Sequence, residues 1–266
     1  MCTLLKIALK LIIFIALTII TQIGGLIYVL SLVITNRWTQ KIKFKTLFVF
    51  MGLYLFSTVL IVPLIAPVFG REKINHSEKI RPTNYMTVLL NRNYVHPELN
   101  ELLNHTEKEL EGKNIEINYL DANFPFINKF PLLPHLSHND GKKIDLSLIY
   151  ETNNGSLSNK QKSVSGYGNY ESPKSNEFNQ IESCIKDGYL QYDFPKYLTF
   201  GNINKDLVFS KKGTKTLITS LLKNSKLGKL YIEPHLKTRM NLKDHRIRYH
   251  GCRAVRHDDH IHVQLN

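Results

Sequence analysis

The chain has 266 residues, a formal net charge of +13 and a mean hydropathy of −0.19. This length suffices for one sizeable core, or for a smaller domain with membrane anchors. The average hydropathy hides a division, because residues 1–70 are mostly apolar and contain no Asp or Glu, whereas residues 71–266 read as an ordinary soluble protein. The composition therefore indicates a strongly apolar N-terminal segment followed by a domain of ordinary polar composition.

Two apolar runs, 11–34 and 47–69, are each long enough to cross a bilayer core, which takes about 20 residues. A signal peptide is an alternative for the first run, but this run exceeds the roughly 7–15 residues of an h-region and no A-x-A-like site follows it. A buried hairpin of a soluble protein is the other alternative. We expect residues 1–70 to form a transmembrane hairpin with spans at about 11–34 and 47–69.

The connection between the two runs, TNRWTQKIKFKT (35–46), holds four basic residues and no acid. Positive residues in short loops favour the cytoplasmic side, so this pattern predicts both termini on the outer side. Basic residues that flank the runs weigh against this orientation: Lys6, Lys10, Arg71, Lys73, Lys79 and Arg81. We expect a multi-pass protein of the cell membrane with an extracytoplasmic domain.

The first 70 residues carry six Lys and Arg, and subtracting them from +13 leaves +7 for residues 71–266. A basic domain suits an anionic partner such as a cell-wall polymer, a membrane surface or nucleic acid. Solubility alone explains many basic domains, and no basic motif interleaved with aromatic residues indicates nucleic-acid binding. The charge thus gives little support to a nucleic-acid partner.

The remaining chain predicts a tether at 71–87 and a mixed domain at 88–266. Apolar spacing predicts helices, and alternation predicts strands. The polar stretch 152–180 predicts a long exposed loop or lid. The expected helices are 96–112 and 212–224, and the expected strands are 114–124, 143–150, 229–236 and 260–265. Helices and short strands without regular βαβ alternation indicate an α+β domain.

Three cysteines occur, at Cys2, Cys184 and Cys252. In an oxidising compartment Cys184 and Cys252 could pair, because disulfides persist there. Two unrelated buried thiols are the alternative, since the sequence does not show whether the geometry permits a bond.

Candidate metal-binding residues cluster in two places. His138 lies seven positions before Asp145, and Gly141 between them permits a tight backbone path. Near the C-terminus, His260 and His262 stand two apart on an expected strand, so both imidazoles point to one face. Two imidazoles and one carboxylate with an open fourth position are typical of catalytic zinc sites. Each half alone also fits a polar surface.

These two motifs carry a resemblance. SHNDGKKID (137–145) resembles the S-H-x-x-G-x-x-x-D signature of murein endopeptidases in the LAS group of zinc peptidases (lysostaphin, D-alanyl-D-alanine peptidase, hedgehog fold). HDDHIHV (257–263) is similar to the closing H-x-x-H-x-H strand of that family. The resemblance covers about residues 88–266 and implies a zinc peptidase domain with a small antiparallel sheet and flanking helices.

The resemblance implies a role for each matching residue. His138, Asp145 and His262 match the zinc ligands, and His260 matches the position beside the metal-bound water, as general base or oxyanion stabiliser. His257 matches a further catalytic histidine and His135 an additional active-site histidine. A zinc-activated water would then hydrolyse peptide (amide) crosslinks of peptidoglycan, without a protein nucleophile.

The chain departs from the family pattern in three features. Lys143 stands where the family usually has an acidic or small residue, the membrane hairpin replaces the usual signal peptide, and the polar insert 152–180 has no clear counterpart. Two alternatives follow. One is a degenerate member that binds zinc or wall polymer without catalysis, and the other is a basic membrane-tethered binding protein whose histidines are incidental.

Overall fold

The structure is a computed structural model that describes residues 2–40 and 42–266. The chain forms two compact units. The first unit comprises residues 1–73, 86–96 and 123–141, and the second comprises residues 74–85, 97–122 and 142–266. Both helices and small sheets are present, so the α+β class expected from the sequence is confirmed.

The first unit contains the apolar helices α1 (Cys2–Thr21), α2 (Gly24–Asn36) and α3 (Lys45–Phe56). From α3 the helix continues through a π turn (Ser57–Ile61), α4 (Val62–Ile65) and a 3₁₀ turn (Ala66–Phe69). Two stretches, Thr3–Thr21 and Lys45–Phe69, are long and apolar enough to cross a membrane by length and composition. Short strands β1 (Glu72–Lys73) and β3 (Tyr94–Val95) pair with each other, and α5 (Met86–Leu89) lies between them in the chain.

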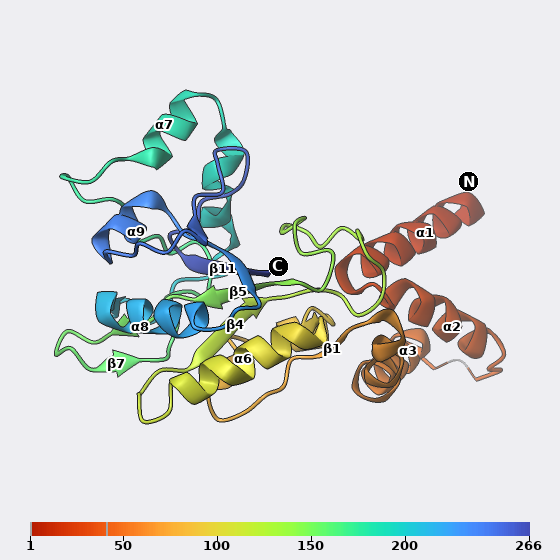
Figure 1. Cartoon of the computed structure of the whole chain (residues 1–266). Coiled ribbons are helices and arrows are strands. Elements are labelled where there is room, and N and C mark those ends of the chain that lie inside the picture. Colours follow the sequence, from red (N-terminus) through yellow and green to blue (C-terminus); the bar gives the residue numbers. More distant parts are fainter. Residues whose placement is uncertain (1, 41) are drawn as a thin grey trace. The chain divides into compact units, whose positions relative to one another are not determined.

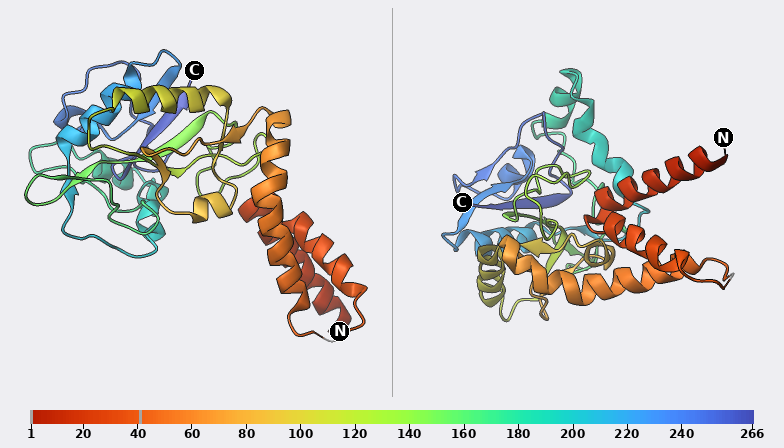
Figure 2. Two further views of the ribbon diagram at one scale, coloured as in Figure 1. Left: turned by 90° about the horizontal axis from the view of Figure 1, so that it is seen from below. Right: turned by 90° about the vertical axis from the view of Figure 1, so that its right-hand side faces the viewer.

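The first apolar run is divided, so 11–34 does not form the single helix that we expected. Gln22 adopts a left-handed backbone (φ 66°) between α1 and α2, and the chain then folds back. A Cβ on Gly25 would lie 2.0 Å from Thr18 Oγ1 of α1, so only glycine permits this close packing of the two helices. Figure 2 shows α1 and α2 as separate helices, while α3 begins at the far end of α2 and runs back beside it.

The second unit is built on a six-stranded sheet in the order β10-β9-β11-β5-β4-β2. The strands are β2 (Ile80–Pro82), β4 (Ile117–Asp121), β5 (Lys143–Ser147), β9 (Leu227–Tyr231), β10 (Ile247–Arg248) and β11 (His260–Leu265). The inner pairs are antiparallel, while β10–β9 and β2–β4 are parallel. The sheet is therefore mixed: its inner pairs are antiparallel, as we expected, whereas its two edge pairs are parallel.

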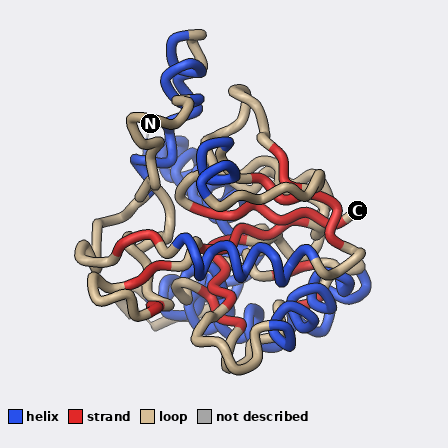
Figure 3. The backbone as a smooth tube through the Cα atoms, turned by 60° about the vertical axis from the view of Figure 1, so that its left-hand side comes forward, coloured by secondary structure: helices blue, strands red, loops and turns tan. Residues whose placement is uncertain are grey.

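One face of this sheet forms the core of the unit. Ile144, Leu146, Ile261, Val263 and Leu230 alternate with polar residues along β5, β11 and β9, and all five are fully buried. Helices α6 (Pro97–Glu109) and α8 (Lys211–Leu222) contact each other and lie along the sheet (Figures 1 and 3). The expected helices 96–112 and 212–224 thus correspond to α6 and α8.

The other expected elements are realised in part. Strand 260–265 is β11, with the same bounds, whereas 143–150 is split into β5 and β6 (Tyr150–Glu151). The expected strand 229–236 ends at Tyr231, because Pro234 begins helix α9 (Pro234–Arg239), and proline is favoured in the first turn of a helix. A third sheet joins β7 (Leu157–Ser158), β6 and β8 (Val208–Phe209).

The stretch that follows β7 is only partly exposed. Gln161, Ser163, Ser165 and Tyr167 are buried, so this part of the polar insert 152–180 is not the exposed lid that we expected. Helix α7 (Gln180–Lys186) follows, and then a 3₁₀ segment (Leu190–Leu198). Cys184 of α7 forms a disulfide with Cys252, which resolves the alternative that the sequence left open.

Candidate metal centre

The candidate site lies on the face of the central sheet opposite the core. Strand register places Asp145 (β5), His262 (β11) and Tyr231 (β9) side by side, and Arg248 (β10) follows Tyr231. Residues paired in this way point to the same face of a sheet. The row across four strands therefore brings together a carboxylate, an imidazole and a phenol that are distant in the sequence.

Asp145 is the centre of the polar contacts in this row. It is 1 % exposed, His262 Nδ1 lies 2.8 Å from its Oδ1, and the Tyr167 hydroxyl donates a hydrogen bond to Oδ2 at 2.8 Å. His260 Nε2 lies 3.8 Å from the same Oδ1. A buried carboxylate held in this way stays ordered, which is the condition for an oriented metal ligand.

Asp145 also belongs to a second group of buried side chains. His135, His138 and Asp145 each offer one ligand atom, and these atoms all lie within 4.8 Å of one another. The imidazoles of His135 and His138 have their centroids 5.6 Å apart. This group could hold a metal ion, and it includes two of the three expected ligands, His138 and Asp145, together with His135, which we expected only as an additional active-site residue.

The loop that carries these two histidines is held closed by backbone contacts of the first unit. His138 N donates to His135 O at 3.0 Å, and His96 N donates to Gly141 O at 2.8 Å. Gly141 has φ +81°, and a Cβ there would lie 3.2 Å from His96 N. The tight path that the sequence indicated at Gly141 is thus confirmed, because a side chain would be strained and crowded.

His260 is fixed by the neighbouring carboxylate of Asp259. His260 Nδ1 lies 2.5 Å from Asp259 Oδ1, and Asp259 Oδ2 accepts a hydrogen bond from Gly168 N at 2.6 Å. Burial opposes the charged imidazolium, but the carboxylates of Asp259 and Asp145 outweigh it and raise the pKa of His260 to about 9. The Nδ1 contact leaves Nε2 as the nitrogen that faces Asp145.

His257 lies in a cluster of aromatic rings on the same side. Its centroid is 4.8 Å from that of His260, 5.8 Å from that of His262 and 5.3 Å from that of His250. Burial lowers the pKa of His257 well below its usual value, and the neighbouring histidines lower it further. His257 is therefore neutral, with one nitrogen able to donate and the other able to accept.

Glu233 supports the backbone at His257. Its Oε1 accepts hydrogen bonds from His257 N at 3.0 Å and from the Tyr192 hydroxyl at 2.6 Å, whereas Oε2 is buried without a hydrogen-bond partner among the described residues. Burial raises the pKa of Glu233 to about 7. This carboxyl group holds the chain just before the H-x-x-H-x-H strand in place.

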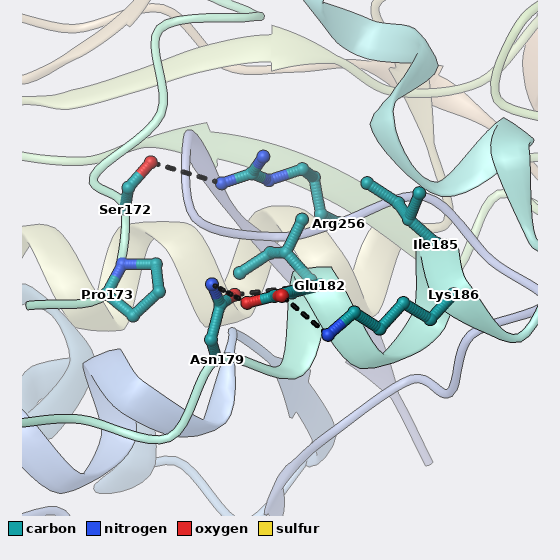
Figure 4. A pocket seen from close by; sticks show the side chains of 8 residues that line it. Ser172, Pro173, Asn179, Glu182, Ile185, Lys186 and Arg256 are labelled. Carbon is teal, nitrogen blue, oxygen red and sulfur yellow. Dashed lines mark hydrogen bonds and ion pairs between the residues drawn. The ribbon is translucent and has the colours of Figure 1, made fainter. Parts of the chain in front are cut away.

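An ion pair stabilises the residues on either side of His257. Arg256 Nε donates to Asp258 Oδ1 at 2.7 Å, and Arg256 Nη1 contacts Asp193 Oδ1 at 2.9 Å. Arg256, His257, Asp258 and Asp259 are all buried, so these polar side chains form a buried network. Figure 4 shows Arg256 and Ser172 at a cavity of about 530 Å³ that also contacts the Glu182–Lys186 pair of α7.

Sequence reasoning missed Tyr167, His250, Tyr231 and Glu233. Tyr167 stands in the polar insert, where the pair Gly166 and Gly168 is the only local signal of a constrained turn; both have positive φ. A Cβ on Gly166 would lie 2.2 Å from Leu120 Cδ2, and one on Gly168 would lie 2.6 Å from Pro195 O. These close approaches aim Tyr167 at Asp145.

The donor set fits a metal ion such as zinc. Imidazole and carboxylate are ligands that Zn²⁺ accepts, at about 2.0–2.2 Å, so neighbouring ligand atoms of a tetrahedral site lie about 3.4 Å apart. The Nδ1–Oδ1 separation of 2.8 Å between His262 and Asp145 is shorter, and metal binding would replace this hydrogen bond by a wider pair. The ligand types suit zinc, while the group itself does not define which metal binds.

Comparison with protein-family models gives no match for this chain, and comparison with curated proteins gives none either.

Proposed function

We propose that this chain is a membrane-anchored zinc metallopeptidase that hydrolyses peptide crosslinks of peptidoglycan. The observation that carries the proposal is the buried carboxylate Asp145, which contacts His262 and belongs to the group with His135 and His138. Zinc would be held by His138, Asp145 and His262. When bound, it supplies a Lewis acid for the scissile carbonyl and an acidified water as nucleophile.

The residues around this group supply the proton transfers that amide hydrolysis requires. Asp259 engages Nδ1 of His260, so His260 accepts or donates a proton at Nε2, on the side of Asp145. His257, neutral and 4.8 Å from His260 between ring centroids, is placed to donate a hydrogen bond to a developing oxyanion. Tyr167 orients Asp145 through its hydroxyl.

Two features support an extracytoplasmic peptidase domain. The Cys184–Cys252 disulfide suits an oxidising compartment. The fold-back at Gln22 places the N-terminal end of α1 and the α2–α3 connection at the far ends of the helices in Figure 2. We infer that the basic residues of both segments lie on the cytoplasmic side, which changes the expected outer N-terminus to an inner one.

The test is zinc content and cleavage by the purified full-length chain in detergent. The proposal expects about one zinc per chain and release of crosslinked peptides from peptidoglycan, with both lost in His138→Ala and His262→Ala. In His135→Ala zinc should be retained, which separates the additional histidine from the ligands. A well-folded chain without zinc would refute the metal site.

Retained zinc without hydrolysis of any peptidoglycan fragment would instead support the degenerate member. One observation favours that alternative: both oxygens of Asp145 already have protein partners, His262 and Tyr167. A buried network of this kind is stable without a metal ion.

A further inference from the structure

The sheet face that carries the candidate ligands continues into a basic row. Register pairs Lys143 (β5) with Gln264 (β11), and Gln264 with Lys229 (β9). This row lies two residues along the strands from the row of Asp145 and His262, on the same face. Arg248 extends the ligand row itself by two strands beyond His262.

Lys229 and Arg248 are charges without compensation. Among residues 2–40 and 42–266, neither side chain has an ion pair or a hydrogen bond, although Lys229 is half-buried and Arg248 is exposed. The neighbouring Arg246 is the contrast, since it pairs with Asp244 at 2.8 Å and donates to two backbone carbonyls. Lys229 and Arg248 therefore present a positive field to whatever occupies this face.

The two cations line one groove. A cavity of about 650 Å³ is bordered by Lys229, Arg248 and Gln264. Arg248 acts on the Tyr231 phenol, where it opposes the rise in pKa that burial causes, so its charge reaches the ligand row. The two cations thus share one groove, and Arg248 pairs with Tyr231 in the strand row that contains His262.

We propose that Lys229 and Arg248 form a subsite that binds a carboxylate of the peptide substrate. The proposal rests on the peptidase function above, and it names the feature of the substrate that is recognised. Strands lie about 4.8 Å apart and alternate residues about 6.7 Å, so the two cations stand about 8–10 Å from His262 between Cα atoms. An extended peptide advances about 3.4 Å per residue, which places the carboxylate within about three residues of the cleaved amide.

The subsite is tested with two crosslinked peptidoglycan peptides that differ only in their carboxylates, free in one and amidated in the other. The full-length zinc-loaded chain is compared with Lys229→Gln and Arg248→Gln. Each variant should raise KM for the free carboxylate about 10-fold and leave KM for the amidated peptide and kcat within about 2-fold. Lys212→Gln, an exposed lysine of α8, is the matched control and should change neither value.

Calorimetric binding of the same two peptides to the same variants gives a readout that does not need catalysis. The subsite is supported if the wild type binds the peptide with free carboxylates more tightly and if Lys229→Gln and Arg248→Gln lose this preference. This result would stand even if no bond is cleaved and the proposed peptidase function fails. Equal binding of both peptides by the wild type overturns the subsite, while zinc-dependent cleavage would still stand. Inorganic phosphate serves as a second anion in the same binding measurement. If the variants lose affinity for phosphate but still bind the free-carboxylate peptide as tightly as the wild type, the groove does not bind the substrate carboxylate, and the subsite is overturned.

Discussion

Arg71 offers the sharpest test of how the histidine-bearing loop is held. It follows the second candidate membrane helix, is 2 % exposed, and its guanidinium donates to Phe124 O, to Asn128 Oδ1 and, at 3.4 Å, to Asn139 O. These three acceptors lie at both ends of the loop that contains His135 and His138. We predict that Arg71→Met, which keeps an unbranched apolar side chain but removes the charge and the donors, loosens this loop without unfolding the chain.

The magnitude follows from the two stronger bonds, to Phe124 and Asn128. A hydrogen bond to a charged group contributes about 1.5–3 kcal/mol, so losing both costs about 3 kcal/mol at the least. Because each 1.4 kcal/mol is a factor of ten, local opening should become about 100-fold more frequent. Native-state hydrogen exchange measures this opening at the amides of Lys129 and His96, which donate to Asn139 O and Gly141 O.

Arg92→Met is the matched control, because Arg92 donates an exposed hydrogen bond to Leu133 O of the same loop, at 2.8 Å. Its removal should accelerate exchange by about 10-fold at most. Equal exchange rates in Arg71→Met and the wild type would show that the loop is held by other contacts, and the reasoning on Arg71 would be refuted.

Three further predictions concern the second unit. Tyr167→Phe removes the hydrogen bond to Asp145 Oδ2 and should weaken zinc binding about 10- to 100-fold in competition with a chelator; unchanged affinity would contradict an orienting role. Since burial raises the pKa of Glu233 to about 7, the folded state retains this proton longer than the unfolded state. The contribution of Glu233 to the free energy of unfolding is therefore complete below about pH 4.5 and falls by about 3 kcal/mol as the pH rises to 7. In urea unfolding measured across this pH range, Glu233→Gln should lack this decrease. Replacing Cys184 and Cys252 by alanine removes a crosslink between residues 68 positions apart and should lower the free energy of unfolding by about 4 kcal/mol. An unchanged free energy of unfolding would show that the unfolded chain is compact without the disulfide.

Part of the candidate site was predictable because it depends on short-range spacing. The alternation in β11 puts His260 and His262 on one face whatever the rest of the chain does, and the strand has the predicted bounds. Gly141 between His138 and Asp145 likewise indicated the tight turn that the structure contains. These are local properties of a few consecutive residues.

Other features depend on contacts between distant residues. Tyr167 reaches Asp145 across 22 positions, and its location in a polar insert gave no sign of burial. The strand order that places Arg248 and Lys229 beside the ligand row follows from pairing across three separate segments. Shifting one strand by two residues against its neighbour leaves the same side chains facing the core. Hydrophobic alternation alone therefore does not determine the register of a strand pair.

The sequence by itself determined the apolar first 70 residues, the α+β character of the remainder and the two histidine motifs, because composition and periodicity act over short distances. The tertiary structure alone decided that the first apolar run folds back at Gln22, that Arg71 is buried against the histidine-bearing loop, and that Asp145 has His262 and Tyr167 as partners. The physical reason is that close packing and buried hydrogen bonds require partners from distant segments, which only the folded chain brings together.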